Sequence, residues 1–212
     1  MEWAALALLT VGAYLLGAIP NGLIISMRMG RDLRAHGSGK TGATNALRVV
    51  GPGPAVAVFA LDALKGALPI LVARWLPWPS VTWLGVAMGA AGLAAVAGHI
   101  WSIWIRLFLG KWGGGRGVAT AFGLTLAVQP WAALAAIAAM AAVVALTRYV
   151  SLGSIMGVVV GLAGVILAAI LGAVPLSFIP AAVLIGGLIV GVHHDNIARL
   201  RAGTERKFGH RV

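Results

Sequence analysis

Residues 151–172 read SLGSIMGVVVGLAGVILAAILG, and this stretch decides the fold class. It carries no charged residue, and as a helix rising about 1.5 Å per residue it is long enough to cross the ~30 Å hydrocarbon core of a bilayer. Gly153, Gly157 and Gly161 recur every four residues, a spacing that lets membrane helices approach closely. The pattern predicts a tightly packed transmembrane helix, and Gly187 and Gly191 predict the same further along.

The rest of the chain has the same character. It is 60% hydrophobic and only 10% charged, whereas soluble domains carry about 25% charged residues. We therefore predict an all-α, polytopic membrane protein that forms one domain over residues 1–212. About seven spans are expected, at roughly 4–27, 53–76, 81–105, 117–129, 130–147, 151–172 and 174–192.

The basic residues give an expected topology. They cluster in four segments at about 28–52, 106–117, 148–154 and 193–212, where Arg211 belongs to the last. The positive-inside rule assigns these segments to the cytoplasm, with the N-terminus outside and the C-terminus inside. Both flanks of residues 117–147 are basic, so this region is divided into two spans at Pro130. The net charge of +11 fits anionic lipid rather than nucleic acid, because most of the chain is apolar.

Two features that the sequence lacks limit the reactions that the protein can catalyse. The chain has no cysteine, which excludes disulfides, thiolate nucleophiles and cysteine-ligated metals. Its few acids, among them Asp32, Asp62, Asp195 and Glu205, are scattered along the sequence, so we expect no metal site and no cofactor.

The first basic segment contains RAHGSGKTGATNALRVVG at residues 34–51. Its Gly39-Lys40-Thr41 resembles the end of a nucleotide-binding P-loop, but Arg34 stands where that motif needs glycine and no short buried strand precedes it. Glycines, hydroxyls and an amide before a helix can instead wrap an anion through backbone N–H groups. Arg48 adds a fixed cation, so the loop predicts an anion site.

The second basic segment contains GGGRGVAT at residues 113–120. A glycine run that opens a helix and includes a guanidinium suits a phosphate oxygen. The alternative is a loose turn with a single topological arginine, Arg116. His99, at the end of the preceding span, is either a structural hydrogen-bonding residue or faces this loop.

Further polar residues are harder to assign. Asp62 and Lys65 lie three apart within a span, as an internal ion pair or as the floor of a polar site. Ser151 is either a helix N-cap or part of that site. In the last segment, a basic tail on an anionic leaflet explains the arginines but not His193 or Glu205.

Taken in order, the motifs are GSGKTGATNALRVVG (37–51), DALKG (62–66), GH (98–99), GGGRGVAT (113–120), RYVSLGS (148–154) and HHDNIARLRAGTE (193–205). This series resembles the bacterial PlsY family of integral-membrane acyl-phosphate:glycerol-3-phosphate acyltransferases over nearly the whole chain. The chain departs from the family pattern at Lys40-Thr41, where Asn-Pro is usual, and at Arg116, where lysine is usual.

The resemblance implies transfer of a fatty acyl group from acyl phosphate to the sn-1 hydroxyl of glycerol 3-phosphate, giving lysophosphatidic acid and phosphate for phospholipid synthesis. It implies no cofactor, and it places the protein in the inner (cytoplasmic) membrane of a bacterium with its active site at the cytoplasmic face. The expected partners are the two substrates and membrane lipid. The oligomeric state does not follow from the sequence.

The resemblance also assigns residues. The catalytic set is Ser38, Arg48, His193, Asn196 and Glu205. The set that binds substrate or phosphate is Gly37, Gly42, Thr44, Asn45, Lys65, His99, Gly114, Gly115, Arg116, Thr120, Ser151 and Ser154.

Two other functions compete with this interpretation. The first is a transporter or flippase for an anionic lipid or organic phosphate, in which Asp62 and Lys65 would couple transport to a gradient. Polar residues gathered on one side of the membrane and the lack of a repeat between halves count against it. The second is a non-catalytic lipid-binding membrane protein.

Overall fold

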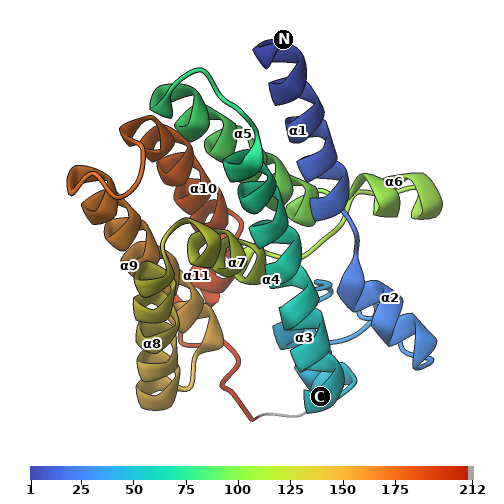
Figure 1. Ribbon diagram of the computed structural model, residues 1–212. Coiled ribbons are helices and arrows are strands. Elements are labelled where there is room, and N and C mark those ends of the chain that lie inside the picture. Colours follow the sequence, from blue (N-terminus) through green and yellow to red (C-terminus); the bar gives the residue numbers. More distant parts are fainter. Residues whose placement is uncertain (210–212) are drawn as a thin grey trace.

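The computed structural model describes residues 1–209, and within them every regular element is a helix (Figure 1). The all-α prediction is confirmed, while the end of the predicted 193–212 segment, with Arg211, lies outside the described residues. The elements are α1 (Glu2–Gly17), α2 (Asn21–Arg28), α3 (Ala43–Val49), α4 (Pro52–Trp75), α5 (Val81–Ile100), α6 (Ile103–Leu109), α7 (Val118–Val128), α8 (Pro130–Thr147), α9 (Val150–Ile170), a 3₁₀ turn η1 (Leu176–Phe178), α10 (Ile179–Gly191) and α11 (His194–Arg201).

Five helical stretches within residues 1–209 are long and apolar enough to cross a membrane: Glu2–Arg28, Pro52–Trp75, Val81–Leu109, Pro130–Thr147 and Val150–Ile170. A sixth is obtained if Leu176–Gly191 and His194–Arg201, which meet at 53°, form one span. Helix α7 has only 11 residues, so its length of about 17 Å is roughly half of the hydrocarbon core. The polytopic architecture agrees with the sequence, whereas seven crossings and the orientation of the termini stay predictions.

Glycines bring the helices into backbone contact. A Cβ built on Gly17 of α1 would overlap the backbone of Ala95 in α5, and one on Gly66 of α4 would overlap the Thr120 carbonyl of α7. Gly153 and Gly157 face α8, as their spacing predicted. The same prediction is wrong for Gly187 and Gly191, which have no neighbouring atom within 4 Å of an added Cβ.

Two helix breaks differ from the predicted spans. The span expected at 4–27 is interrupted between α1 and α2 because Pro20 has no N–H to donate within a helix. The span expected at 81–105 ends at Ile100, and α6 begins after Ser102, whose Oγ accepts a hydrogen bond from Ile105 N at 3.2 Å. Figure 1 shows α2 following α1 after a short extended stretch, and α6 beginning beside the lower end of α1. The two breaks free carbonyl groups that polar side chains from other helices then bind.

Helix α7 lies inside the bundle, where it contacts α4 on one side and α8 and α9 on the other (Figure 1). The glycine-rich loop that precedes its first turn therefore lies in the middle of the molecule rather than at its edge. This placement brings the second basic segment next to the first.

Candidate functional site

The two glycine loops meet. The first, residues 29–42, connects α2 to α3, and the second, residues 110–117, connects α6 to α7. The Thr41 N–H donates a hydrogen bond to the Gly114 carbonyl at 3.3 Å. The second loop is also fixed to the end of α5, because Gly115 N donates to the His99 carbonyl at 3.1 Å. The two loops, each predicted separately to bind an anion, therefore lie side by side.

The glycines of the second loop are needed for close approach. A Cβ on Gly114 would overlap the carbonyl oxygens of His99 and Ile100, and one on Gly115 would overlap the His99 ring. Gly117 has φ +83°, a left-handed conformation that favours glycine. These glycines set the conformation of the loop. Gly114 and Gly115 do not line the polar pocket that lies beside the loop and is described below.

Asn45 organises the first loop. Its Oδ1 accepts from Ser38 N at 2.9 Å, while its Nδ2 lies 2.9 Å from the carbonyl oxygens of Leu33 and Lys40 and 3.1 Å from that of His36. The side chain is buried, and both of its N–H groups are bonded within the loop, so it has no donor left for a phosphate. Its expected role as a phosphate ligand is better described as that of a residue that holds the loop.

A polar pocket lies where the loops meet the first turns of α7 and α9. Ten of the residues assigned from the sequence line it: Ser38, Gly42, Thr44, Asn45, Arg48, His99, Arg116, Ser151, Ser154 and His193. The other seven do not line it: Gly37, Lys65, Gly114, Gly115, Thr120, Asn196 and Glu205. Of these, Thr120 is fully buried at the α4–α7 contact.

Arg48 and Arg116 bring unpaired positive charge to the pocket. Neither forms a salt bridge within residues 1–209, and the Arg116 Nε is buried without a hydrogen-bond partner. Burial lowers the pKa of both guanidinium groups, and neighbouring arginines lower it further, Arg206 for Arg48 and Arg199 for Arg116. Because guanidinium groups stay protonated in proteins, two partly buried cations without acidic partners fit an anionic ligand.

Glu205 is the centre of a hydrogen-bond cluster behind the pocket. Its Oε1 accepts from Ser151 Oγ at 2.9 Å and from Asn196 Nδ2 at 2.7 Å, and its Oε2 accepts from Arg199 Nε at 2.7 Å. Burial raises the pKa of Glu205, but these hydrogen bonds outweigh burial, so its pKa lies below the usual value. The cluster ties the segment after α11 to the start of α9.

His193 has a defined orientation. Its Nδ1 lies 2.7 Å from the Ile189 carbonyl, and because a carbonyl only accepts, Nδ1 carries the hydrogen. In the neutral ring Nε2 is therefore left as an acceptor. His193 is buried and lines the pocket, where this nitrogen can receive a hydrogen bond from a hydroxyl.

The floor of the pocket contains the predicted ion pair. Lys65 Nζ lies 2.9 Å from Asp62 Oδ1 and donates to the Ile19 carbonyl at the α1–α2 break, also at 2.9 Å. Asn21 Nδ2 donates to the same Asp62 oxygen at 3.0 Å. Asp62 lines the pocket and Lys65 does not. Asn21 was not among the site residues predicted from the sequence, although a polar residue after proline inside an apolar run is a usable signal.

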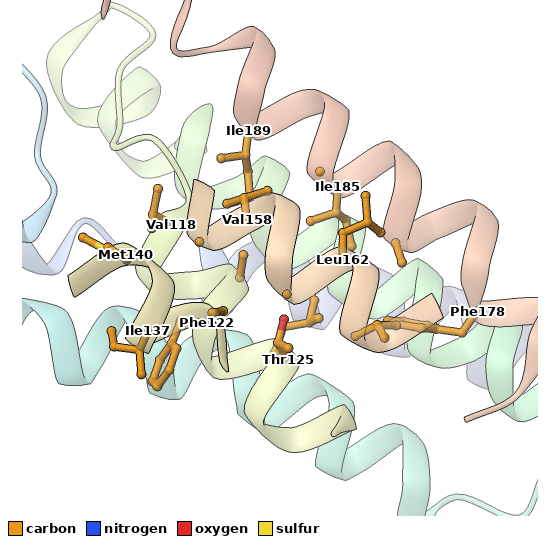
Figure 2. A pocket seen from close by; sticks show the side chains of 18 of the residues that line it. Val118, Phe122, Thr125, Ile137, Met140, Val158, Leu162, Phe178, Ile185 and Ile189 are labelled. Carbon is orange, nitrogen blue, oxygen red and sulfur yellow. The ribbon is translucent and has the colours of Figure 1, made fainter. Parts of the chain in front are cut away.

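An apolar pocket adjoins the polar one between α7, α8, α9 and α10 (Figure 2). Phe59, Val118 and Met140 line both pockets and so mark their junction. Figure 2 shows Val118 and Met140 at one end of the apolar pocket and Phe178 at the other. None of these three junction residues was predicted as a site residue, because apolar residues in spans carry no distinguishing signal.

Comparison with known proteins agrees with this geometry. The family model described as glycerol-3-phosphate acyltransferase matches residues 7–203. A protein named glycerol-3-phosphate acyltransferase from Thermus thermophilus is 42% identical over 200 residues, which is 94% of each chain. The protein of the same name from Trichlorobacter lovleyi is 44% identical over 201 residues, covering 93% of this chain and 94% of the relative. None of these matches supports the transporter interpretation.

Solved structures are similar over the same extent. The glycerol 3-phosphate form of PlsY (YgiH), an integral membrane glycerol 3-phosphate acyltransferase, superposes with a TM-score of 0.84 at 37% identity and covers 97% of this chain and 96% of that one. Its lysphosphatidic acid form gives 0.82 at 36% identity with the same coverage. The protein belongs to the glycerol-3-phosphate acyltransferase family.

Proposed function

We propose that the protein transfers a fatty acyl group from acyl phosphate to the sn-1 hydroxyl of glycerol 3-phosphate, at the cytoplasmic face of a bacterial cytoplasmic membrane. One observation carries this proposal. A pocket with two unpaired guanidinium groups, Arg48 and Arg116, adjoins an apolar pocket, and Phe59 lines both. This arrangement suits two phosphorylated molecules of which one has a long apolar chain.

The proposed chemistry needs no nucleophile from the protein, because acyl phosphate is a mixed anhydride and is already activated. The acceptor oxygen attacks the acyl carbon, a new ester bond forms, and the bond between that carbon and the phosphate oxygen breaks. Phosphate leaves with the bonding electrons. The hydroxyl proton passes to a phosphate oxygen or to the free Nε2 of His193.

The residues would divide this work by position. Arg116 lies at the entrance of α7, next to the junction with the apolar pocket, so it would stabilise charge that develops on the leaving phosphate. Arg48 and Thr44 of α3, with Ser38 of the first loop, would hold the phosphate of the acceptor. Glu205 and Asn45 would act indirectly, by holding the segments that carry these groups.

The test is direct assay of the purified protein in detergent or nanodiscs. With acyl phosphate and labelled glycerol 3-phosphate we expect equimolar lysophosphatidic acid and phosphate, and no product with acyl-CoA as the control donor. Arg48→Gln should lower kcat/KM at least 100-fold. Arg34→Gln is the matched control, because Arg34 pairs with Asp32 at 2.7 Å and does not line the pocket. Product from acyl-CoA alone would refute the donor, and full activity of Arg48→Gln would refute the site.

A further inference from the structure

We infer that Asp62 binds the carbon-2 hydroxyl of the acceptor and thereby selects a vicinal diol phosphate over a simple hydroxyalkyl phosphate. The inference rests on the proposed function and names a specificity contact within the same pocket. The observation behind it concerns one atom, the Oδ2 oxygen of Asp62. Asp62 Oδ2 is buried and has no hydrogen-bond partner within residues 1–209, yet Asp62 lines the pocket.

The two carboxylate oxygens of Asp62 have different surroundings. Oδ1 is held by Lys65 Nζ at 2.9 Å and Asn21 Nδ2 at 3.0 Å, neither of which lines the pocket, and His99 Nδ1, which does belong to a lining residue, lies 3.8 Å from it. These donors fix the carboxylate and supply its counter-charge. An unpartnered buried carboxylate oxygen is costly unless a ligand or water donates to it, so Oδ2 calls for a donor from the pocket.

The chemistry of the pocket identifies that donor. Arg48, Arg116 and Lys40 supply donors for phosphate oxygens, whereas Asp62 is the one acidic side chain among the described residues that line the pocket. A phosphate cannot donate to it in its ionised form, but a hydroxyl can. The acceptor therefore presents its phosphate to the cations and a hydroxyl to Asp62.

Position distinguishes the two hydroxyls. The hydroxyl that becomes acylated has to face the donor carbon near the junction with the apolar pocket, and Asp62 does not line the apolar pocket. The hydroxyl on carbon 2 keeps its proton throughout the reaction, so it remains a donor to Oδ2 in substrate and product alike. Recognition of a hydroxyl by a buried polar group discriminates strongly against an analogue that lacks it.

The experiment compares glycerol 3-phosphate with 3-hydroxypropyl phosphate, which keeps the primary hydroxyl but lacks the one on carbon 2. In the unaltered protein we expect kcat/KM to favour glycerol 3-phosphate by about 10- to 100-fold. In Asp62→Asn the fixed donors keep the amide oxygen at the Oδ1 position, so an NH₂ group replaces Oδ2. The carbon-2 hydroxyl can then only accept a neutral hydrogen bond instead of donating a charge-assisted one, so the preference should fall by at least about threefold. Because the ratio is taken within one preparation, partial loss of folded protein cancels.

Two further variants complete the test. Asp62→Asn combined with Lys65→Met removes the uncompensated lysine and should show the same lost preference. Asp32→Asn, the same chemical change at a carboxylate outside the pocket, should keep the full preference. Where a variant has lost turnover, titration calorimetry with the two acceptors gives the ratio of their dissociation constants instead. An unchanged preference in the Asp62 variants, or no preference in the unaltered protein, overturns the inference, whereas failure to acylate either acceptor refutes the proposed function instead.

Discussion

The Thr41 amide donates a hydrogen bond to the Gly114 carbonyl across 3.3 Å, and this bond joins two loops that are more than seventy residues apart in sequence. The donor belongs to the loop that carries Ser38, and the acceptor belongs to the loop that carries Arg116. A shift in either backbone would therefore change the separation of the groups expected to hold the two substrates.

This contact makes Gly114→Ala informative. The added Cβ would overlap the carbonyls of His99 and Ile100, so the second loop has to move away from α5. We expect kcat/KM to fall at least 100-fold, with a small drop in melting temperature in detergent. Gly53→Ala is the control, because its Cβ meets no atom within 4 Å. Equal activity of the two variants would show that loop contact does not set the site.

Arg116 allows a test of charge against shape. Arg116→Lys keeps the positive charge and restores the residue that the family pattern usually has, so we expect activity within about tenfold of the unaltered protein. Arg116→Gln removes the charge and leaves the other cations in place, and it should lose at least 100-fold in kcat. Phosphate release under saturating substrate measures both. If Gln and Lys perform alike, charge at this position is not used in the reaction.

The sequence predicted the helical class, the glycine contacts of α9 and the residues of the two loops, because each depends on local composition or spacing. It missed the break at Pro20, although proline supplied the signal, since the apolar run continued across it. It did not show that the N–H groups of the Asn45 side chain bond to carbonyl groups of its own loop, or that Thr120 faces α4. Helix register and side-chain partners are set by tertiary packing. The pairing of Asn21 with Asp62 spans 41 residues and has no local signature.

Asn45→Ala tests the difference between a ligand and a loop-holding residue. The substitution leaves buried backbone groups at Leu33 and Lys40 without their donor, at a cost of about 2–3 kcal/mol in local stability. We expect faster proteolysis within residues 29–42 in the absence of substrate and a raised KM for glycerol 3-phosphate. A purely ligating residue would raise KM while leaving the proteolysis rate unchanged. Thr44→Ala, on the pocket wall without a side-chain hydrogen bond in the described part of the chain, is the comparison.

The lowered pKa of Glu205 predicts that the C-terminal segment loses stability at acid pH. Its folded-state pKa is lowered, so its stabilising contribution is complete above the unfolded value of about 4.3 and is lost as the pH falls below that and through the lower folded value. We expect docking of residues 203–209 to be constant from pH 8 to pH 5 and to weaken below about pH 4, measured as protease cleavage of this segment. Glu205→Gln should be cleaved at every pH and lack the acid step. Asp195→Asn, at an exposed carboxylate, should retain the step.

The apolar pocket predicts how the protein selects the length of the acyl chain. Phe178, at the end remote from Val118 and Met140 (Figure 2), is fully buried and closes that end of the pocket. Phe178→Ala should shift the preferred acyl phosphate to a longer chain, by about two to four carbons on volume grounds. Gly161 lines the pocket, and a Cβ added there would lie 3.3 Å from Ala136 Cβ and 4.0 Å from Thr125 Cγ2. Gly161→Leu would therefore fill part of the pocket, so it should lower kcat/KM for long chains at least tenfold and spare short ones. Leu167→Ala, an exposed position on α9 outside the pocket, controls for general effects on the helix. A uniform loss across chain lengths in both pocket variants would mean that the acyl chain lies elsewhere, on the lipid-facing surface.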